Sequence, residues 1–179
     1  MHKRSFGLVI SVLLITLAGI YFLEFNKDPA PQSAGLLNNT LPAIDLPLLK
    51  EGPEQQQRLT KADFEGRRVI VHFFASWCKY CREEHPVIKA LGARTDITLF
   101  GVNIHDKRED SLNWLESEGD PYDLIGFDEA GETASAWGVM ATPQTFVVDE
   151  KGIIIYQYSG SLTPERVREE ILPLFGEAS

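Results

Sequence analysis

The sequence predicts an α/β domain in which helices flank a mixed central β-sheet. The clearest observation is the run Val69–Phe74, whose β-branched and aromatic residues are typical of a strand buried on both faces. A helix is expected directly after it at residues 79–94, and a second strand and helix at residues 97–103 and 108–118. A β-hairpin and a closing helix near the C-terminus then require antiparallel pairing in the same sheet.

Shorter elements complete this expected fold. Residues 41–49 are apolar but interrupted by prolines, which predicts an edge strand at most. We expect a polar loop at residues 50–58, a short turn or helix at residues 59–64 and another short helix at residues 131–137.

The end of the domain is expected to be a hairpin followed by a helix. Its strands are predicted at residues 145–149 and 153–158, with Glu150-Lys151-Gly152 as the tight turn. Thr163 suits the N-cap of the last helix, and Pro164 suits the first helical position because it has no N–H to lose.

The N-terminus is predicted to be a membrane anchor over residues 1–25. Lys3 and Arg4 precede an uncharged run at residues 5–23, and about 20 residues cross a hydrocarbon core. A cleaved signal has a shorter apolar region, whereas here apolar residues continue past the small pair Ala18-Gly19. We therefore expect an uncleaved, single-pass anchor, with a removed signal as the alternative. The positive residues should stay cytoplasmic, which places the domain across the membrane. In a bacterium that is the oxidising, periplasmic side of the inner membrane.

Residues 26–39 are expected to form a flexible linker rich in Pro, Gly and polar residues, and residues 40–179 to form the folded domain. The whole chain has 179 residues and a formal net charge of −9. This charge argues against nucleic acid as a partner, because phosphate binding requires a basic face.

Cys78 and Cys81 are the only cysteines, and they lie where the buried strand gives way to the helix. The unpaired N–H groups at a helix N-terminus stabilise a thiolate, which is the species that attacks a disulfide. Cys78 is therefore the predicted exposed nucleophile, and Cys81, one turn inside, is the predicted resolving thiol. A static disulfide would close only a small loop, and a structural zinc site would need four ligands. Redox exchange is the interpretation that we favour, with no cofactor beyond the Cys78–Cys81 disulfide.

Four neighbouring side chains are candidates for supporting roles. Glu84 either tunes proton transfer at Cys81 or is an exposed helix carboxylate. His72 either carries a proton to that thiol or is a core histidine bonded to a backbone carbonyl. Trp77 either covers the dithiol as part of a substrate surface or simply packs. His85 either joins the two cysteines as a soft metal ligand, suited to copper, or lies on the helix surface.

Several motifs together resemble one family. They are Ala75-Ser-Trp-Cys-Lys-Tyr-Cys-Arg-Glu-Glu-His-Pro86, Gly101-Val-Asn103, Gly119-Asp-Pro-Tyr122, Phe127-Asp-Glu-Ala-Gly131 and Gly138-Val-Met-Ala-Thr-Pro-Gln-Thr-Phe-Val-Val-Asp149. The domain resembles the thioredoxin-like thiol–disulfide oxidoreductases of cytochrome c maturation, the DsbE/CcmG type. This resemblance implies a thioredoxin-like fold, a kink at Pro86 in the active-site helix and a cis Thr142–Pro143 bond that presents the Thr142 backbone to an extended substrate.

The resemblance also implies partners. The substrate would be apocytochrome c, whose cysteines are kept reduced for haem attachment, or haem-ligation components, and the electron donor would be an integral-membrane thiol reductant. We expect a monomer. The family usually has a glutamate after the cis-proline, whereas this chain has Gln144. This difference puts in question whether the chain has the family's acidic active-site surface. Alternatives are a general reductase for copper-site assembly, a metal-carrying assembly chaperone and a binding module with an inert disulfide.

Overall fold

The computed structural model describes residues 35–50 and 58–176. The predicted anchor and residues 26–34 of the predicted linker lie outside the described residues, as does most of the predicted polar loop at residues 50–58. Within the described ranges, no helix has the length and apolar character that crossing a membrane requires.

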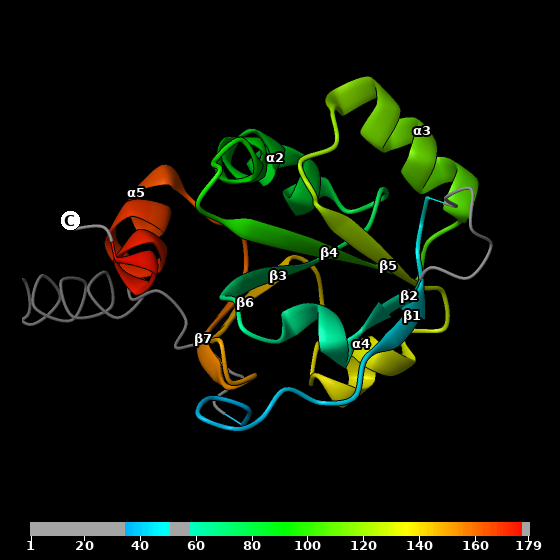
Figure 1. The fold of residues 1–179 in the computed structure, drawn as a ribbon. Helices are drawn as coiled ribbons and strands as arrows, with labels where there is room; N and C mark the ends of the chain where they lie inside the picture. The colour runs from blue at the N-terminus through cyan, green and yellow to red at the C-terminus, as the bar shows by residue number, and fades with distance from the viewer. Residues whose placement is uncertain (1–34, 51–57, 177–179) are drawn as a thin grey trace, which may run out of the picture. The chain divides into compact units, whose positions relative to one another are not determined.

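The described domain is built on a five-stranded mixed sheet in the order β5-β4-β3-β6-β7 (Figure 1). The strands β3 and β4 are parallel, as are β4 and β5, whereas β6 runs antiparallel to both β3 and β7. Their bounds are β3 (Val69–Phe74), β4 (Thr98–Ile104), β5 (Leu124–Asp128), β6 (Gln144–Val148) and β7 (Ile154–Ser159). The mixed sheet predicted from the order of elements is confirmed.

Helices cover both faces of this sheet. They are α2 (Lys79–Gly92), α3 (Arg108–Glu118), α4 (Glu132–Ala136) and α5 (Pro164–Arg166), with a short 3₁₀ helix at Lys61–Phe64. One buried cluster joins residues of α2, α3 and the C-terminal helical segment, and a second joins residues of α4 and the Lys61–Phe64 helix. Figure 1 shows α2 and α3 together on one side of the sheet.

The central strand β3 supplies both clusters, because successive side chains of a strand point to opposite faces. Ile70 and Phe74 lie in the cluster under α2, and Val71 and Phe73 lie in the other. All six residues of β3 are buried, as its continuous run of β-branched and aromatic residues predicts. The dithiol segment therefore leaves a strand that packing fixes on both faces.

One strand of the sheet was not predicted. The segment of β5 is short and contains Gly126, which weakens the apolar pattern. Its close packing explains the glycine: a Cβ at Gly126 would lie 2.7 Å from Cδ1 of Leu46. The segment Asp45–Pro47 forms β1, which pairs with β2 (Arg58–Thr60) in a separate two-stranded sheet.

The hairpin and the last helix predicted near the C-terminus are confirmed with small shifts in their bounds. The hairpin turn joins β6 and β7, and the side chain of Thr163 accepts the Arg166 N–H at 3.2 Å as the N-cap of α5. After α5, residues Val167–Ile171 form a π-helical turn and Leu172–Phe175 a 3₁₀ turn, so the last helix is irregular. Pro173 lacks the N–H that would continue an α-helical ladder here.

Candidate active site

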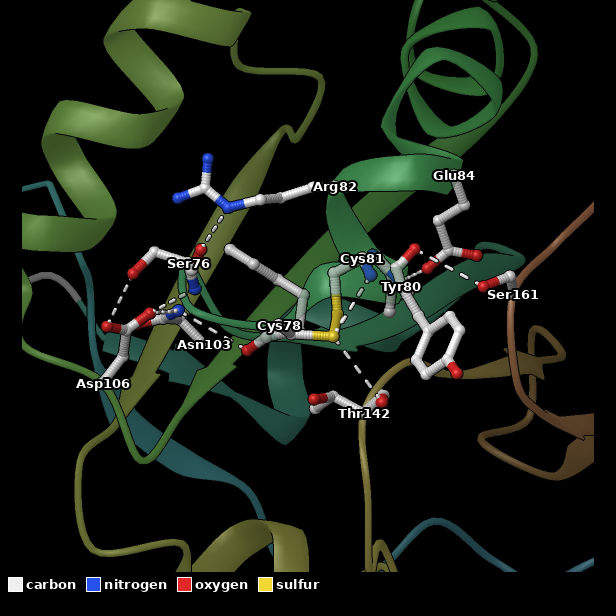
Figure 2. Close-up of a disulfide and its surroundings, with 12 residues drawn as sticks. Ser76, Cys78, Tyr80, Cys81, Arg82, Glu84, Asn103, Asp106, Thr142 and Ser161 are labelled. Carbon is white, nitrogen blue, oxygen red and sulfur yellow. Dashed lines mark hydrogen bonds and ion pairs between the residues drawn. A yellow bond between two sulfur atoms is a disulfide. The ribbon is translucent and has the colours of Figure 1, made fainter.

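Cys78 and Cys81 form a disulfide at the start of α2, with their Cα atoms 5.3 Å apart (Figure 2). Cys78 is the N-cap residue of α2, and its sulfur accepts the backbone N–H of Cys81 at 3.1 Å. The N–H of Cys81, in the first turn of the helix, therefore points at the sulfur that has to carry the negative charge of a thiolate. The predicted place of Cys78 at the helix N-terminus is confirmed.

The predicted exposure of Cys78 is wrong for the oxidised pair. Its exposed fraction is 4%, against 1% for Cys81, and its sulfur lies 3.6 Å from the carbonyl oxygen of Thr142. The loop that precedes β6 thus covers one edge of the disulfide. This contact joins residues 64 positions apart, so the local sequence pattern does not predict the burial of Cys78. The Thr142–Pro143 peptide bond is cis, as the resemblance implied.

Large apolar side chains are exposed around this buried disulfide. Trp77 is 61% exposed, Tyr80 is 59% exposed and Met140 is 92% exposed, and each lies within three residues of Cys78 or Thr142 in the sequence. Exposed apolar side chains that gather at one place mark an interaction site rather than a packed core. Simple packing, the alternative considered for Trp77, does not describe a side chain with this exposure.

Behind the disulfide, three buried polar side chains form a chain of hydrogen bonds. His72 lies between Glu84 and Tyr122, with Nε2 3.0 Å from Oε1 of Glu84 and Nδ1 2.8 Å from the Tyr122 hydroxyl. The backbone N–H of Leu162 donates to the second Glu84 oxygen. One of the two alternatives considered for each residue is therefore wrong. His72 is not bonded to a backbone carbonyl, and Glu84, which is 2% exposed, is not a surface carboxylate.

The protonation of Tyr122 fixes one arrangement of this chain. Burial, with the nearby charges of Glu84 and Asp120, raises the pKa of Tyr122 well above its ordinary value, so the phenol keeps its proton. With the phenol as donor to Nδ1 of His72, Nε2 carries the ring hydrogen and donates it to Oε1 of Glu84. All three side chains are then satisfied, and every donor points toward Glu84.

His85 is buried at 3% exposure, so the expectation of a helix-surface residue is wrong. Its Nε2 lies 2.9 Å from the Gly119 carbonyl oxygen, and its ring packs 4.6 Å from that of Trp114. Burial lowers the pKa of His85, and the charge of Lys89 acts in the same direction, against the hydrogen bond to the Gly119 carbonyl and the charge of Glu118. Among the described residues, no group of three His, Cys, Asp or Glu side chains is arranged to hold a metal ion.

Two further positions matter to the site. Gln144 is 2% exposed and lies opposite Phe73 in the sheet, so it adds nothing to the surface that a target would contact. Asp106, which was not predicted, accepts hydrogen bonds from Ser76 at the start of the dithiol loop. A polar residue just after a parallel strand was the one signal that could have indicated it.

The sheet order, the helix-capping cysteine and the adjacent cis-proline together define a thioredoxin-like thiol–disulfide oxidoreductase. The Redoxin family matches residues 28–172. Proteins named thiol:disulfide interchange protein DsbE are similar over nearly the whole chain. The protein from Xylella fastidiosa is 34% identical, covering 96% of this chain and 83% of that protein, and the one from Pseudomonas aeruginosa is 30% identical, covering 97% and 94%. The chain therefore belongs to the DsbE-type thiol:disulfide interchange proteins of the Redoxin family.

A solved structure agrees with this assignment. The crystal structure of a DsbE-type thiol:disulfide interchange protein from Chlorobium tepidum superposes with a TM-score of 0.66 at 26% identity, covering 78% of this chain and 98% of that one. The redox centre of this enzyme is the Cys78–Cys81 pair, and the chemistry of the family needs no cofactor beyond that disulfide.

Proposed function

We propose that this oxidoreductase is a membrane-anchored dithiol reductase of the bacterial periplasm. Its target is the cysteine pair of apocytochrome c, or a haem-ligation component, which it keeps reduced for haem attachment. The likeness to DsbE proteins and the motifs Gly119–Tyr122 and Phe127–Gly131 support this target. The apolar run at residues 5–23 and the positive residues before it support the anchor, and an integral-membrane thiol reductant on the same side returns the electrons.

The observation that carries the proposal is the setting of the Cys78 sulfur. It caps α2, lies beside the Thr142 carbonyl and is flanked in sequence by the exposed side chains of Trp77 and Tyr80. An apolar surface around a shallow reactive sulfur suits an extended polypeptide better than a small soluble disulfide. We assign the role of target contact to Trp77 and to the Thr142–Pro143 segment, acting in a monomer.

The reaction follows from the two cysteine positions. In the reduced protein the Cys78 thiolate attacks one sulfur of the target disulfide, which forms a mixed disulfide and releases the first target thiolate. Cys81 then loses its proton and attacks the Cys78 sulfur, which restores the Cys78–Cys81 bond and releases the second target thiolate. The target gains two electrons and the protein loses two.

The proton of Cys81 needs an acceptor, because the exposed fraction of this residue is only 1%. Glu84 lies one turn further along α2 and is held by His72 and the Leu162 N–H. We propose that Glu84 receives this proton, directly or through a water, and that the hydrogen bonds from His72 and the Leu162 N–H hold the carboxyl group in place for the transfer.

Trapping of the mixed disulfide tests the proposed target. In the full chain, Cys81→Ser removes the resolving thiol, so the Cys78-linked target should accumulate and separate on a non-reducing gel. Apocytochrome c or a haem-ligation component, identified by mass spectrometry, is the expected partner. The control Cys78→Ser should trap nothing.

Three other results would each contradict a part of the proposal. Trapping of only unrelated proteins would favour a general reductase. Copper bound by the wild-type chain and lost in both cysteine variants and in His85→Ala would favour an assembly chaperone. Release of the chain from membranes by alkaline washing would contradict the anchor separately.

A further inference from the structure

The two residues that follow β4 hold the two residues that precede Cys78. The backbone carbonyl of His105 accepts the indole N–H of Trp77 at 2.9 Å. The carboxylate of the next residue, Asp106, accepts hydrogen bonds from Ser76. Two consecutive residues of one loop thus contact two consecutive residues of another, at sequence separations of 28 and 30.

Asp106 is the centre of this contact, and its exposed fraction is 6%. One oxygen accepts the Ser76 backbone N–H at 2.5 Å, the Asn103 amide at 3.0 Å and the Ser111 hydroxyl at 2.9 Å. The other accepts the Ser76 hydroxyl and the Lys107 backbone N–H, both at 2.9 Å. Figure 2 shows the carboxylate beside Ser76, at the start of the loop that leads to the disulfide.

The charge state of Asp106 agrees with this arrangement. Burial acts to raise the pKa of Asp106, but the hydrogen bonds from Asn103, Ser76 and Ser111 outweigh it and hold the pKa below its ordinary value. A buried carboxylate with five donors is therefore ionised at neutral pH, and each donor that it loses leaves a buried polar group unsatisfied.

Ser76 is held on its other side by the active-site helix. The carbonyl oxygen of Ser76 accepts the Nε–H of Arg82, from the second turn of α2, at 2.7 Å. The N–H, the hydroxyl and the carbonyl of Ser76 are therefore all bonded. Because only Trp77 separates this residue from Cys78, the position of the nucleophile depends on these bonds.

His105 is itself fixed in place. Its φ is 49°, in the left-handed region that non-glycine residues seldom occupy. Its ring lies over Gly131, where a Cβ atom would stand 2.0 Å from the His105 Cε1. This packing fixes the carbonyl that holds the exposed Trp77 indole.

We propose that Asp106 is a positioning residue for the attack of Cys78, acting through Ser76, with the His105 carbonyl holding Trp77 in the same geometry. The proposal rests on the thiol–disulfide oxidoreductase activity alone. It is independent of whether the natural target is a cytochrome, because any disulfide that Cys78 attacks would reveal the effect.

Asp106→Asn in the full chain tests the proposal. The amide keeps the size of the side chain but replaces one acceptor oxygen with a donor, so it cannot satisfy all five partners. The reduced protein is mixed with an aryl disulfide reagent whose released thiolate absorbs visible light, and the rate of the first release is recorded from acidic to alkaline pH. We expect the rate of the first release on the alkaline plateau, where Cys78 is fully ionised, to fall by about 10- to 100-fold. Misplacing a reacting atom by a small distance has an effect of this size.

The pH profile distinguishes positioning from the two simpler effects. Loss of the negative charge alone would shift the pH at the midpoint of the rate profile and leave the plateau rate unchanged. Loss of stability alone would lower the denaturant concentration at which the variant unfolds and leave both the midpoint pH and the plateau rate unchanged.

Asp128→Asn is the matched control. Asp128 is also a buried carboxylate at the end of a parallel strand, but it accepts the Ala134 N–H of α4 at 2.8 Å. We expect this control to lose stability and to keep the wild-type plateau. Ser76→Ala, which removes only the hydroxyl bond to Asp106, should lower the plateau by a smaller factor.

Two results would overturn the proposal: a plateau for folded Asp106→Asn within about twofold of wild type, or an equal fall in Asp128→Asn. If Asp106→Asn does not fold, Ser76→Ala decides, and an unchanged plateau in that variant would overturn the proposal as well.

Discussion

Glu84→Gln should slow the second step of the reaction and leave the first unchanged. The substitution keeps the size of a side chain that is buried with 2% exposure, and it removes the group that we assign as proton acceptor for Cys81. The glutamine carbonyl can still accept the Leu162 N–H, and its amide can donate to His72 in place of the bond from Nε2. The local geometry can therefore survive the loss of charge.

The magnitudes separate the stability effect from the catalytic effect. Hydrogen bonds to a charged group contribute about 1.5–3 kcal/mol each, and since glutamine re-forms both contacts, we expect a loss of about 1–2 kcal/mol in the free energy of unfolding. General-base assistance contributes about 10²–10⁴-fold. A fall of about 100-fold in the resolving rate corresponds to about 2.7 kcal/mol in the barrier.

A single-turnover experiment with the aryl disulfide reagent measures both steps. The first released thiolate reports the attack of Cys78, and the second reports the attack of Cys81 on the mixed disulfide. Glu84→Gln should slow only the second release. The neighbouring Glu83→Gln is the control, because Glu83 is exposed and its carboxylate lies 3.5 Å from Lys79. A second release in Glu84→Gln within about threefold of wild type would refute the assignment of Glu84 as the proton acceptor.

Two further predictions concern stability. Because burial lowers the pKa of His85, the unfolded chain binds a proton that the folded chain does not once the pH falls below about 6.5, so stability should decrease from that pH downward. Urea titrations between pH 7 and pH 5 should show this decrease in the wild type and a smaller one in His85→Gln; equal slopes would contradict the assignment. Phe73→Ala should cost about 3–5 kcal/mol in the free energy of unfolding, because its buried ring packs 5.5 Å from both Trp137 and Phe146. A loss below about 1 kcal/mol in denaturant titration would show that this core cluster rearranges.

The sequence predicts best the parts of the fold that local pattern controls. The strand Val69–Phe74 and the helix Arg108–Glu118 have the predicted bounds, because a run of β-branched and aromatic residues and a helical pattern each depend on neighbouring residues. The place of Cys78 at a helix N-terminus follows from the junction between strand and helix. The strand β5 was missed because Gly126 is explained by the side chains of Leu46 and Leu59, which are far away in the sequence.

The partners of the buried polar groups could not be predicted in this way. His72 was a candidate from the sequence, but its bonds reach Glu84 and Tyr122, at separations of 12 and 50 residues. Glu84 is buried because the chain returns to it at Leu162, 78 residues later. Such contacts depend on how the strands and helices pack, which no local periodicity records.

The reduction potential of the Cys78–Cys81 pair tests the central claim most directly. The full chain would be equilibrated with a series of glutathione redox buffers, and the fraction of reduced protein measured by thiol alkylation. A dithiol reductase should have a value clearly below the roughly −120 mV of a strong oxidant, in the region of the roughly −270 mV of thioredoxin. A value at the oxidant end would contradict the account and make the protein a donor of disulfides to its targets.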